Sequence, residues 1–438
     1  MYKFLTKSRI LFNRSYTTIG NSTIATITKP RTTSIYIHWP YCSKICPYCS
    51  FNKYMDGPHV DHSAMKQSFL TELNQIVKKY YGENGSDLPK LTSIYFGGGT
   101  PSLAPVDTIT SIVNESLKLF NVDRQQLLQQ HQNDNHDHSL EITLEVNPDK
   151  IDIDKLSDFK NHSLINRVSL GVQAFNDKDL KFLGRTHTAN DAKQAISKCN
   201  QLFKRVNFDL IYARHQNQTK EQWKQEINEA IDLCERGHIS LYSLCFEEGT
   251  KLNNKKNNQI IPADHDLNFE LYEIAKQQLE RAGINQYEIS NFSRENQRSR
   301  HNLNYWRGGD YIGIGPGACS RITKLDGTRH SLKCVLHPRS WITQVTDTGD
   351  GLDTVESKQL TIEERVNELL LMGLRTVEGV NRETFKSITN GKDIEDVLSA
   401  TKLKYLISNG MLSLDNNRLC STTKGFMLLD KIILEICL

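Results

Sequence analysis

The sequence contains no apolar run long enough to cross a membrane as a helix. The longest candidate, residues 425–438, is interrupted by Asp430, Lys431 and Glu435 and predicts a terminal amphipathic helix instead. Hydrophobic residues make up 38% and charged residues 24% of the 438 positions, which is typical of a soluble globular protein. A chain of this length can form one large α/β domain together with a smaller domain.

Acidic residues are absent before Asp56, and the first 55 positions contain eight Lys or Arg and frequent Ser and Thr. An acid-poor start with Arg and Ser is typical of a mitochondrial transit peptide, whereas a secretory signal needs a long apolar core. We therefore predict a transit peptide over residues 1–33 and a location in the mitochondrial matrix, with an ordinary polar tail as the alternative. The net charge falls from +3 to −5 without these eight basic residues, so charge gives no argument for binding nucleic acid.

The ten cysteines do not form a disulfide scaffold, because three are clustered and seven are scattered, which predicts a reducing compartment. The cluster is Cys42, Cys46 and Cys49, with the spacing C-x3-C-x2-C after a short apolar run. Three thiolates on one short loop suit an iron–sulfur cluster or zinc. Two alternatives stay open: a helical stripe of buried cysteines, which Pro47 disfavours, and a zinc site with His38 as fourth ligand.

Short apolar runs and helical segments alternate along the first 290 residues. Six runs predict strands, at residues 34–39, 93–96, 141–146, 167–172, 206–212 and 238–246. Three of the intervening segments have clear helical periodicity, at residues 63–80, 219–236 and 264–282. Six βα units in series predict a parallel sheet with helices outside it, as an open or closed barrel.

Unusual residues occur at or after the ends of several of these strands, where ligands gather in parallel α/β folds. The second strand is followed by Gly97, Gly98, Gly99 and Thr100, which allow a ligand to approach backbone amides closely. Polar side chains near the next three strands must find partners if they are buried. They are Glu145, Gln173, Arg185 and Asp209.

A second group of candidate residues lies in the segment 300–306, which has the pattern HNxxYW and contains His301, Tyr305 and Trp306. From the sequence alone, a hydrogen-bonded loop histidine is the simpler interpretation of His301. A Gly-rich strand or turn follows, and the tail from Leu360 predicts a small helical domain ending in a hairpin, like a winged helix. Without excess positive charge, this tail is not predicted to bind DNA.

The cysteine loop followed by GGGTP resembles the pattern of the radical S-adenosylmethionine (SAM) superfamily. The resemblance implies a partial (β/α)6 barrel in which the three cysteines hold three irons of a [4Fe–4S] cluster. It also implies that the fourth iron is chelated by SAM, which an electron from the cluster cleaves to a 5′-deoxyadenosyl radical. The SAM contacts that it implies are Tyr36, Tyr48, Gly98, Gly99, Thr100, Glu145, Gln173, Arg185 and Asp209.

Within this superfamily the chain is similar to the oxygen-independent coproporphyrinogen III oxidase group, and in that group to HemW-type haem chaperones. HNxxYW is a HemW-type motif associated with haem binding, so the resemblance implies haem contacts from His301, Tyr305 and Trp306. True oxidases have a fourth cysteine two positions after the third, where this chain has Phe51. The chain also departs from the group at residues 213–218, which replace Gly-Leu-Pro-Gly-Gln, and at Cys319, which replaces a frequent histidine.

Three functions remain open at this point. The first is a haem chaperone that carries the cluster and SAM, has no coproporphyrinogen oxidase activity, and has haem, haem-accepting proteins and a reductant as partners. The second is an oxygen-independent coproporphyrinogen III oxidase, and the third is a zinc-stabilised structural protein. Peripheral membrane association is compatible with the first function, and nucleic acid is not an expected partner.

The expected organisation has four parts. A transit peptide at residues 1–33 precedes the radical SAM barrel at residues 34–290. An extension at residues 291–355 contains HNxxYW and the Gly-rich segment. A mainly helical, winged-helix-like domain at residues 356–438 completes the chain.

Overall fold

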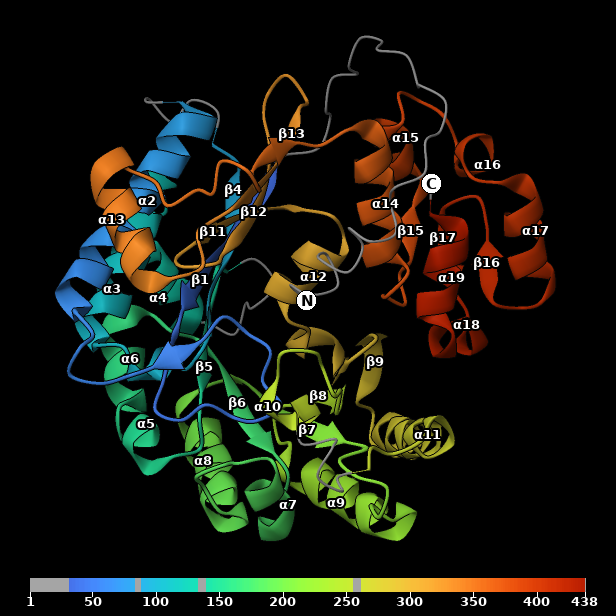
Figure 1. Cartoon of the computed structure of the whole chain (residues 1–438), viewed down its shortest axis with the longest axis horizontal. Helices are drawn as coiled ribbons and strands as arrows, with labels where there is room; N and C mark the ends of the chain where they lie inside the picture. Colours follow the sequence, from blue (N-terminus) through green and yellow to red (C-terminus); the bar gives the residue numbers. More distant parts are fainter. Residues whose placement is uncertain (1–30, 83–87, 133–138, 255–260, 438) are drawn as a thin grey trace.

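The computed structural model describes residues 31–82, 88–132, 139–254 and 261–437. In this part of the chain, one large curved sheet is covered by helices on its outer face, and a smaller helical domain lies beside it (Figure 1). The predicted transit peptide falls almost entirely outside the described residues. The first strand begins at Thr32, so the last two positions of the predicted segment 1–33 belong to the barrel.

Six parallel strands form the centre of the sheet, and they correspond to the six runs that the sequence predicts. In spatial order they are β1 (Thr32–Trp39), β4 (Lys90–Gly98), β5 (Glu141–Val146), β6 (Arg167–Gln173), β7 (Arg205–Tyr212) and β8 (His238–Ser243). This spatial order follows the chain, as expected for successive βα units. The predicted α/β class and the partial barrel are therefore confirmed.

Additional strands extend the sheet at both ends. Beyond β8 lie the antiparallel strands β10 (Asn291–Ser293) and β9 (Asn285–Glu288). Beyond β1 lie parallel β11 (Asp310–Ile314) and then antiparallel β12 (Cys319–Thr323), β13 (Arg329–Lys333) and β14 (Lys358–Gln359). The predicted Gly-rich segment thus forms β11 and the turn after it.

Helices on the outer face bury apolar stripes against the strands (Figure 1). The three predicted long helices are α2 (His62–Tyr81), α9 (Lys220–Leu233) and α11 (His265–Arg281), and each begins after a residue whose side chain accepts a backbone N–H. The remaining helices of this domain are α3 (Val106–Leu119), α4 (Arg124–Gln132), α5 (Lys150–Asp154), α6 (Leu156–Ser163), α7 (Asp177–Phe182), α8 (Ala189–Leu202), α10 (Lys251–Asn254), α12 (Arg300–Trp306) and α13 (Pro338–Thr348).

The two faces of the central strands differ in chemistry. In β5, Ile142 and Leu144 are fully buried in the apolar core under the helices, whereas Glu141 and Glu145 lie on the opposite face. Because successive side chains of a strand alternate between faces, this opposite face is the interior of the barrel. The interior is therefore polar, and it offers charged and hydroxyl groups to a ligand at its open end.

Buried hydrogen bonds and ion pairs connect the strands across the base of the barrel. Arg205 lies 3.0 Å from Glu141, and Arg167 donates to Asn207 at 2.5 Å. Burial raises the pKa of Glu141, but Arg205, Arg167 and the backbone N–H groups of residues 300 and 301 together lower it by more, so the carboxylate stays ionised. These contacts fix the register of neighbouring strands, and the register determines where the residues at their carboxyl ends lie.

The C-terminal domain is mainly helical, as predicted, and its hairpin is followed by two short helices. Its elements are α14 (Ile362–Gly373), β15 (Val380–Asn381), α15 (Arg382–Ile388), α16 (Ile394–Val397), α17 (Ala400–Ser408), β16 (Leu412–Leu414), β17 (Arg418–Ser421), α18 (Thr423–Met427) and α19 (Leu429–Ile436). The strands pair as a small antiparallel sheet in the order β15-β17-β16. Leu370, Phe385 and Leu419 belong to an apolar core that is separate from the core of the barrel.

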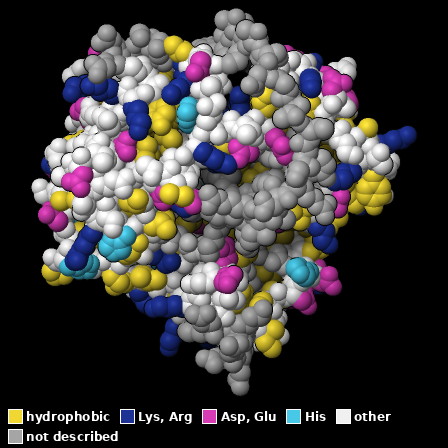
Figure 2. All heavy atoms as spheres, turned by 45° about the horizontal axis from the view of Figure 1, so that its top comes forward, with side chains coloured by type: hydrophobic (Ala, Val, Ile, Leu, Met, Phe, Trp, Pro, Cys, Tyr) yellow, Lys and Arg dark blue, Asp and Glu magenta, His cyan; other side chains and the backbone are white. Residues whose placement is uncertain are grey.

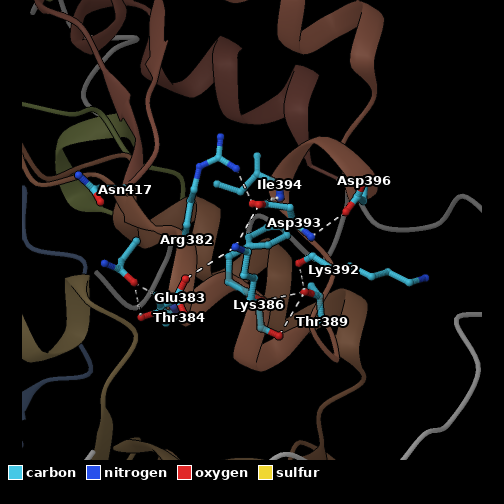
Figure 3. Close-up of polar contacts among 12 residues, drawn as sticks. Arg382, Glu383, Thr384, Lys386, Thr389, Lys392, Asp393, Ile394, Asp396 and Asn417 are labelled. Atoms are coloured by element: carbon cyan, nitrogen blue, oxygen red, sulfur yellow. Dashed lines mark hydrogen bonds and ion pairs between the residues drawn. The ribbon is translucent and has the colours of Figure 1, made fainter.

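A charged cluster fixes α15 to the start of α16 (Figure 3). Arg382 donates to Asp393 at 2.5 Å and to Glu395 at 2.6 Å, and the Lys386 ammonium lies 3.2 Å from Asp393. Asn381 caps α15, because its Oδ1 accepts a hydrogen bond from Thr384 N at 3.0 Å. The position of α15 matters because this helix forms part of a cavity described below.

On the face drawn in Figure 2, basic and acidic side chains are interspersed among apolar and neutral ones. No helix among the described residues is long and apolar enough to span a membrane. The predicted amphipathic segment at the C-terminus forms α18 and α19, and it packs Ile432 and Ile436 into the core of the C-terminal domain.

Candidate cofactor site

The three cysteines lie on a loop that two short parallel strands close at its base, β2 (Tyr41–Cys42) and β3 (Tyr54–Met55). Cys42 is buried, whereas Cys46 and Cys49 are partly exposed. Cys49 N donates to Cys46 O at 3.2 Å in a tight turn between the second and third cysteines. Because this segment is a loop, the alternative of a helical cysteine stripe is wrong.

His38 and Asn52 hold the cysteine loop against the barrel. His38 Nε2 lies 2.7 Å from Asn52 O, and His38 Nδ1 lies 3.0 Å from Tyr36 Oη. The side chain of Asn52 donates to Pro316 O at 2.9 Å and to Leu336 O at 2.8 Å. Both ring nitrogens are engaged, so this residue does not fit the role of a fourth zinc ligand.

The glycine triplet packs directly on the base of the cysteine loop. Gly98 has φ of +113°, and a Cβ there would lie 2.7 Å from the His38 ring. A Cβ on Gly99 would lie 2.6 Å from Tyr41 O and 3.0 Å from Cys42 Sγ. Only glycine allows this approach, because any side chain would push the loop away from the strand.

Two partly buried carboxylates lie at the open end of the barrel. Glu145 accepts hydrogen bonds from Tyr95 Oη at 2.8 Å and from Gly98 N at 3.2 Å, and Asp209 accepts one from Asn207 at 3.2 Å. Burial and the neighbouring Asp209 together raise the pKa of Glu145 to about 7, and burial raises the pKa of Asp209 to about 6. A cationic ligand beside these groups would favour their ionised form.

Arg185 connects the cysteine loop to the strand ends. Its Nη1 donates to Cys46 Sγ at 3.4 Å, and its Nη2 donates to Asn147 Oδ1 at 2.7 Å and to Gly171 O at 2.9 Å. Asn147 in turn donates to Thr100 Oγ1 at 3.2 Å. The structure therefore joins Cys46, Thr100 and Arg185, which are predicted from three separate parts of the sequence, into one network.

The other predicted contacts surround this network. Tyr36 lies on β1 beside His38, and Tyr48 packs against an apolar cluster that contains Leu183 and Leu252. Gln173 ends β6 with φ of +72°, at a position where the pairing with β7 shifts register. Such a conformation is uncommon for a residue with a side chain, and uncommon backbone geometry occurs preferentially at functional sites.

The site fits the cofactors that the resemblance implies. Three thiols lie on one loop, and the backbone of Gly99 lies against Cys42. The carboxyl groups of Glu145 and Asp209 have raised pKa values, which a bound cation would lower. Among the described residues, no three His, Cys, Asp or Glu side chains are arranged around a single metal ion. A [4Fe–4S] cluster does not need such an arrangement, because each thiolate binds a different iron.

The HNxxYW residues lie on α12 and not in a loop as the sequence suggests. His301 is fully buried: Nδ1 lies 3.0 Å from Ser93 Oγ, Nε2 lies 2.9 Å from Tyr305 Oη, and the ring stacks on Tyr95. Burial lowers the pKa of His301 to about 3. The interpretation of His301 as a hydrogen-bonded histidine is confirmed, and in this arrangement neither ring nitrogen is free for haem iron. The indole N–H of half-buried Trp306 has no partner among the described residues.

Three residues of the site were missed by the sequence patterns. Tyr95 alternates with Gly97 along β4, Asn147 directly follows β5, and Asn52 follows the third cysteine by three positions. Tyr95 and Asn147 show the same signal as the predicted residues, a polar group near the carboxyl end of a strand. Asn52 gives no such signal, because its two carbonyl acceptors lie more than 260 positions away in the chain.

This parallel barrel, with a three-cysteine loop over its carboxyl end, defines a radical SAM protein. Residues 36–229 match the model of the radical SAM superfamily, and residues 360–428 match the model of the HemN C-terminal domain. These matches agree with the division between the barrel and the C-terminal domain in the structure.

The most informative relatives cover nearly the whole chain. The mitochondrial radical S-adenosyl methionine domain-containing protein 1 of Dictyostelium discoideum is 43% identical over 429 residues, 92% of this chain and 94% of the relative. The haem chaperone HemW of Haemophilus influenzae is 32% identical over 358 residues, 81% of this chain and 86% of the relative. The chain therefore belongs to the radical SAM superfamily, in the family that contains these two relatives. The name of the Dictyostelium relative agrees with the predicted mitochondrial location.

The solved structure of coproporphyrinogen III oxidase (HemN) from Escherichia coli is also similar. It superposes with a TM-score of 0.72 and covers 93% of this chain and 90% of that chain, at 18% sequence identity. At this identity, the similarity shows a shared fold and leaves the activity to be argued from the site.

Proposed function

We propose that this protein is a haem chaperone that binds haem and transfers it to haem-dependent proteins, on a scaffold that holds a [4Fe–4S] cluster and SAM. The name of the Haemophilus influenzae relative supports this function. The observation that carries the proposal against the oxidase alternative is Phe51. It occupies the position of the fourth cysteine of true oxidases, offers no thiol, and is 54% exposed on the cysteine loop.

In this proposal, Cys42, Cys46 and Cys49 hold the cluster, and Glu145 and Asp209 bind the positively charged part of SAM. When bound, the two cofactors supply one-electron chemistry that side chains cannot provide. The residues of the chain position this pair: Arg185 orients Cys46, and the glycine triplet keeps the loop against β4. We propose that this chemistry serves the control or delivery of haem rather than decarboxylation.

The HNxxYW segment is proposed to serve haem binding through its aromatic residues. Tyr305 and Trp306 offer flat faces that suit a macrocycle. His301 supports Tyr305 through a hydrogen bond of 2.9 Å. For His301 to ligate iron directly, it would have to leave Ser93 and Tyr305 without their present partner, at a cost of about 1–3 kcal/mol for each buried group left unpaired.

The test is anaerobic reconstitution of the cluster, followed by haem titration and a coproporphyrinogen oxidase assay on the same sample. The expected result is a saturable shift of the Soret band and no conversion of coproporphyrinogen III. Conversion of the substrate in proportion to deoxyadenosine released would establish the oxidase and refute the chaperone.

The cluster assignment has its own control. Replacing Cys42, Cys46 and Cys49 with Ala should abolish bound iron and sulfide, whereas replacing buried Cys199, which lies on α8, should leave both unchanged. Iron retained in the triple variant would show that the cysteine loop is not the ligand set.

A further inference from the structure

A cavity of about 220 Å³ lies between the barrel and the C-terminal domain. Residues of β11, β12, β13 and the end of α12 form its wall on the barrel side, and residues of α14 and α15 form the opposite wall. Arg31 and Thr32 line it at the start of β1, whereas the cysteine loop follows the other end of that strand. The cavity is therefore distinct from the cofactor site.

Basic groups outnumber acidic groups in the lining. The charged residues that line the cavity are Arg31, Arg321, Arg329, Arg365, Asp310 and Glu368. The two carboxylates are already occupied, because Arg329 donates to Asp310 at 2.8 Å and Arg321 donates to Glu368 at 2.7 Å. The surplus positive charge in the lining favours an anionic ligand.

Arg365 is the basic residue best placed to take such a ligand. Its Nη1 donates to Gly327 O at a long 3.3 Å, and its Nε is buried with no partner among the described residues. Burial and the neighbouring Arg329 lower the pKa of Arg365 by more than Asp310 and Glu368 raise it. A bound carboxylate would satisfy the unpaired donor and relieve the repulsion between these two guanidinium groups.

The rest of the lining is apolar or aromatic. Leu369, Met372 and Ile388 line the wall of the C-terminal domain. On the barrel side, Tyr305 and Tyr311 meet edge to face with ring centroids 4.3 Å apart. Tyr305 belongs to the HNxxYW segment, so this segment reaches the cavity through Tyr305 while His301 stays behind it in the barrel.

We propose that this cavity binds a propionate arm of the haem, with Arg365 as the principal contact to the carboxylate and Tyr305 beside the attached ring edge. This inference rests on the proposed chaperone function and adds the place and the chemistry of binding. The combination of guanidinium groups with an apolar wall matches a ligand in which a carboxylate is attached to a hydrophobic plate.

The volume of the cavity limits how much of the haem could enter it. Pockets that enclose a whole drug-sized ligand have volumes of about 300–1,000 Å³. A cavity of about 220 Å³ is smaller and suits an arm of a larger molecule. The macrocycle would therefore remain partly outside, which is consistent with a carrier that must release it to another protein.

The test compares haem with haem dimethyl ester, in which both propionates are esterified, on the reconstituted full-length protein. The wild type should bind haem roughly tenfold more tightly than the ester, since a charge-assisted hydrogen bond is at stake. Arg365→Gln should lose most of this preference by weakening haem binding while leaving ester binding unchanged. Arg365→Lys, which keeps the charge, should retain part of it.

Controls separate the possible failures. Arg281→Gln makes the same change in an exposed arginine at the end of α11, outside the cavity, and should bind like the wild type. If the wild type binds no haem, the chaperone function is refuted. If haem binds but the wild type does not distinguish it from the ester, or Arg365→Gln retains the distinction, the chaperone function stands and the cavity assignment is wrong.

A free anion is the other source of the same chemistry. Inorganic phosphate, titrated alone, should raise the thermal midpoint of the wild type little and should compete with haem only weakly. Strong phosphate binding that Arg365→Gln abolishes, with no difference between haem and its ester, would make the cavity a small-anion site and overturn the propionate assignment.

Discussion

At the residue scale, Arg214 explains how this chain departs from the family pattern around residues 213–218. Ala213 adopts φ of +53°, a conformation that the expected glycine would take more easily. Arg214 is fully buried, forms ion pairs with Asp179 and Glu226, and lies over the ring of Trp223. The segment 213–218, which follows β7, is thus held by a buried charged cluster in place of the glycine- and proline-containing sequence of the family.

Removing this guanidinium should be costly. Arg214→Met is expected to lower the free energy of unfolding by about 3–5 kcal/mol, because two largely buried carboxylates lose their counter-charge. Chemical denaturation measures the change, with exposed Arg281→Met as a control expected to stay within about 0.5 kcal/mol of the wild type. A decrease in the free energy of unfolding of less than about 1 kcal/mol would show that water replaces the guanidinium and that the charged cluster does not hold this segment.

Glu145 and Asp209, at the open end of the barrel, predict that SAM binding depends on pH. With burial raising the pKa of Glu145 to about 7 and that of Asp209 to about 6, affinity for the sulfonium should increase from pH 6 to pH 8 as both groups ionise. Calorimetric titration at several pH values measures this increase. Asp209→Asn should flatten its lower part, and an affinity that is constant across the range would contradict the assignment.

The same carboxylates affect the apo fold with the opposite sign. A raised carboxyl pKa stabilises the fold fully below the unfolded value, about 4.3 for Glu, and this contribution is lost as the pH rises through about 7. SAM should therefore stabilise the protein most at the alkaline end of this range, where the apo protein has lost this contribution.

At the scale of one element, α12 connects the two sites of the molecule. His301 stacks on Tyr95 at 4.7 Å, and Tyr95 donates to Glu145 at the cofactor site. On its other side, His301 contacts Tyr305, which lines the cavity between the domains. One short helix therefore provides a contiguous path of contacts between the proposed SAM site and the proposed haem site.

A substitution on this helix distinguishes support from ligation. His301→Gln should reduce stability by about 1–3 kcal/mol, because Ser93 and Tyr305 lose well-placed partners. It should weaken haem binding but leave the Soret maximum of the bound form where it is in the wild type. A displaced maximum at saturating haem would show that His301 is an axial ligand after all.

At the scale of the whole molecule, the barrel needs its first strand intact. β1 pairs with β4 on one side and with β11 on the other, with partners from Thr32 and Thr33 onwards. It therefore joins the cofactor strands to the extension that holds α12 and the cavity. Any processing of the N-terminus must leave this strand complete.

Mitochondrial import should therefore remove residues only upstream of Thr32. Fusing residues 1–31 to a fluorescent reporter should direct it to mitochondria, and N-terminal sequencing of the imported protein should begin at or before Thr32. A control fusion with the basic residues of this segment changed to Gln should remain cytosolic. Diffuse signal from the unmodified fusion would refute the targeting prediction.

Local patterns in the sequence predict the strands, the long helices, the cysteine loop and the strand-end residues because each depends on neighbours close in the chain. The alternation of polar and apolar residues in β5 and the glycine triplet after β4 are examples. In a parallel barrel, a strand of buried apolar residues that is followed by a polar group places that group at the carboxyl end of the sheet, where ligands bind. The residues proposed to hold the cofactors could therefore be predicted from the sequence.

The sequence by itself determined the fold class, and it predicted the cluster ligands and the SAM contacts. Only the tertiary structure decided that His301 is enclosed by Ser93 and Tyr305, that Asn52 anchors the cysteine loop, and that Arg365 lines the cavity between the two domains. These outcomes depend on contacts between residues far apart in the chain. No local pattern encodes such contacts, because they arise only when the barrel closes and the C-terminal domain packs against it.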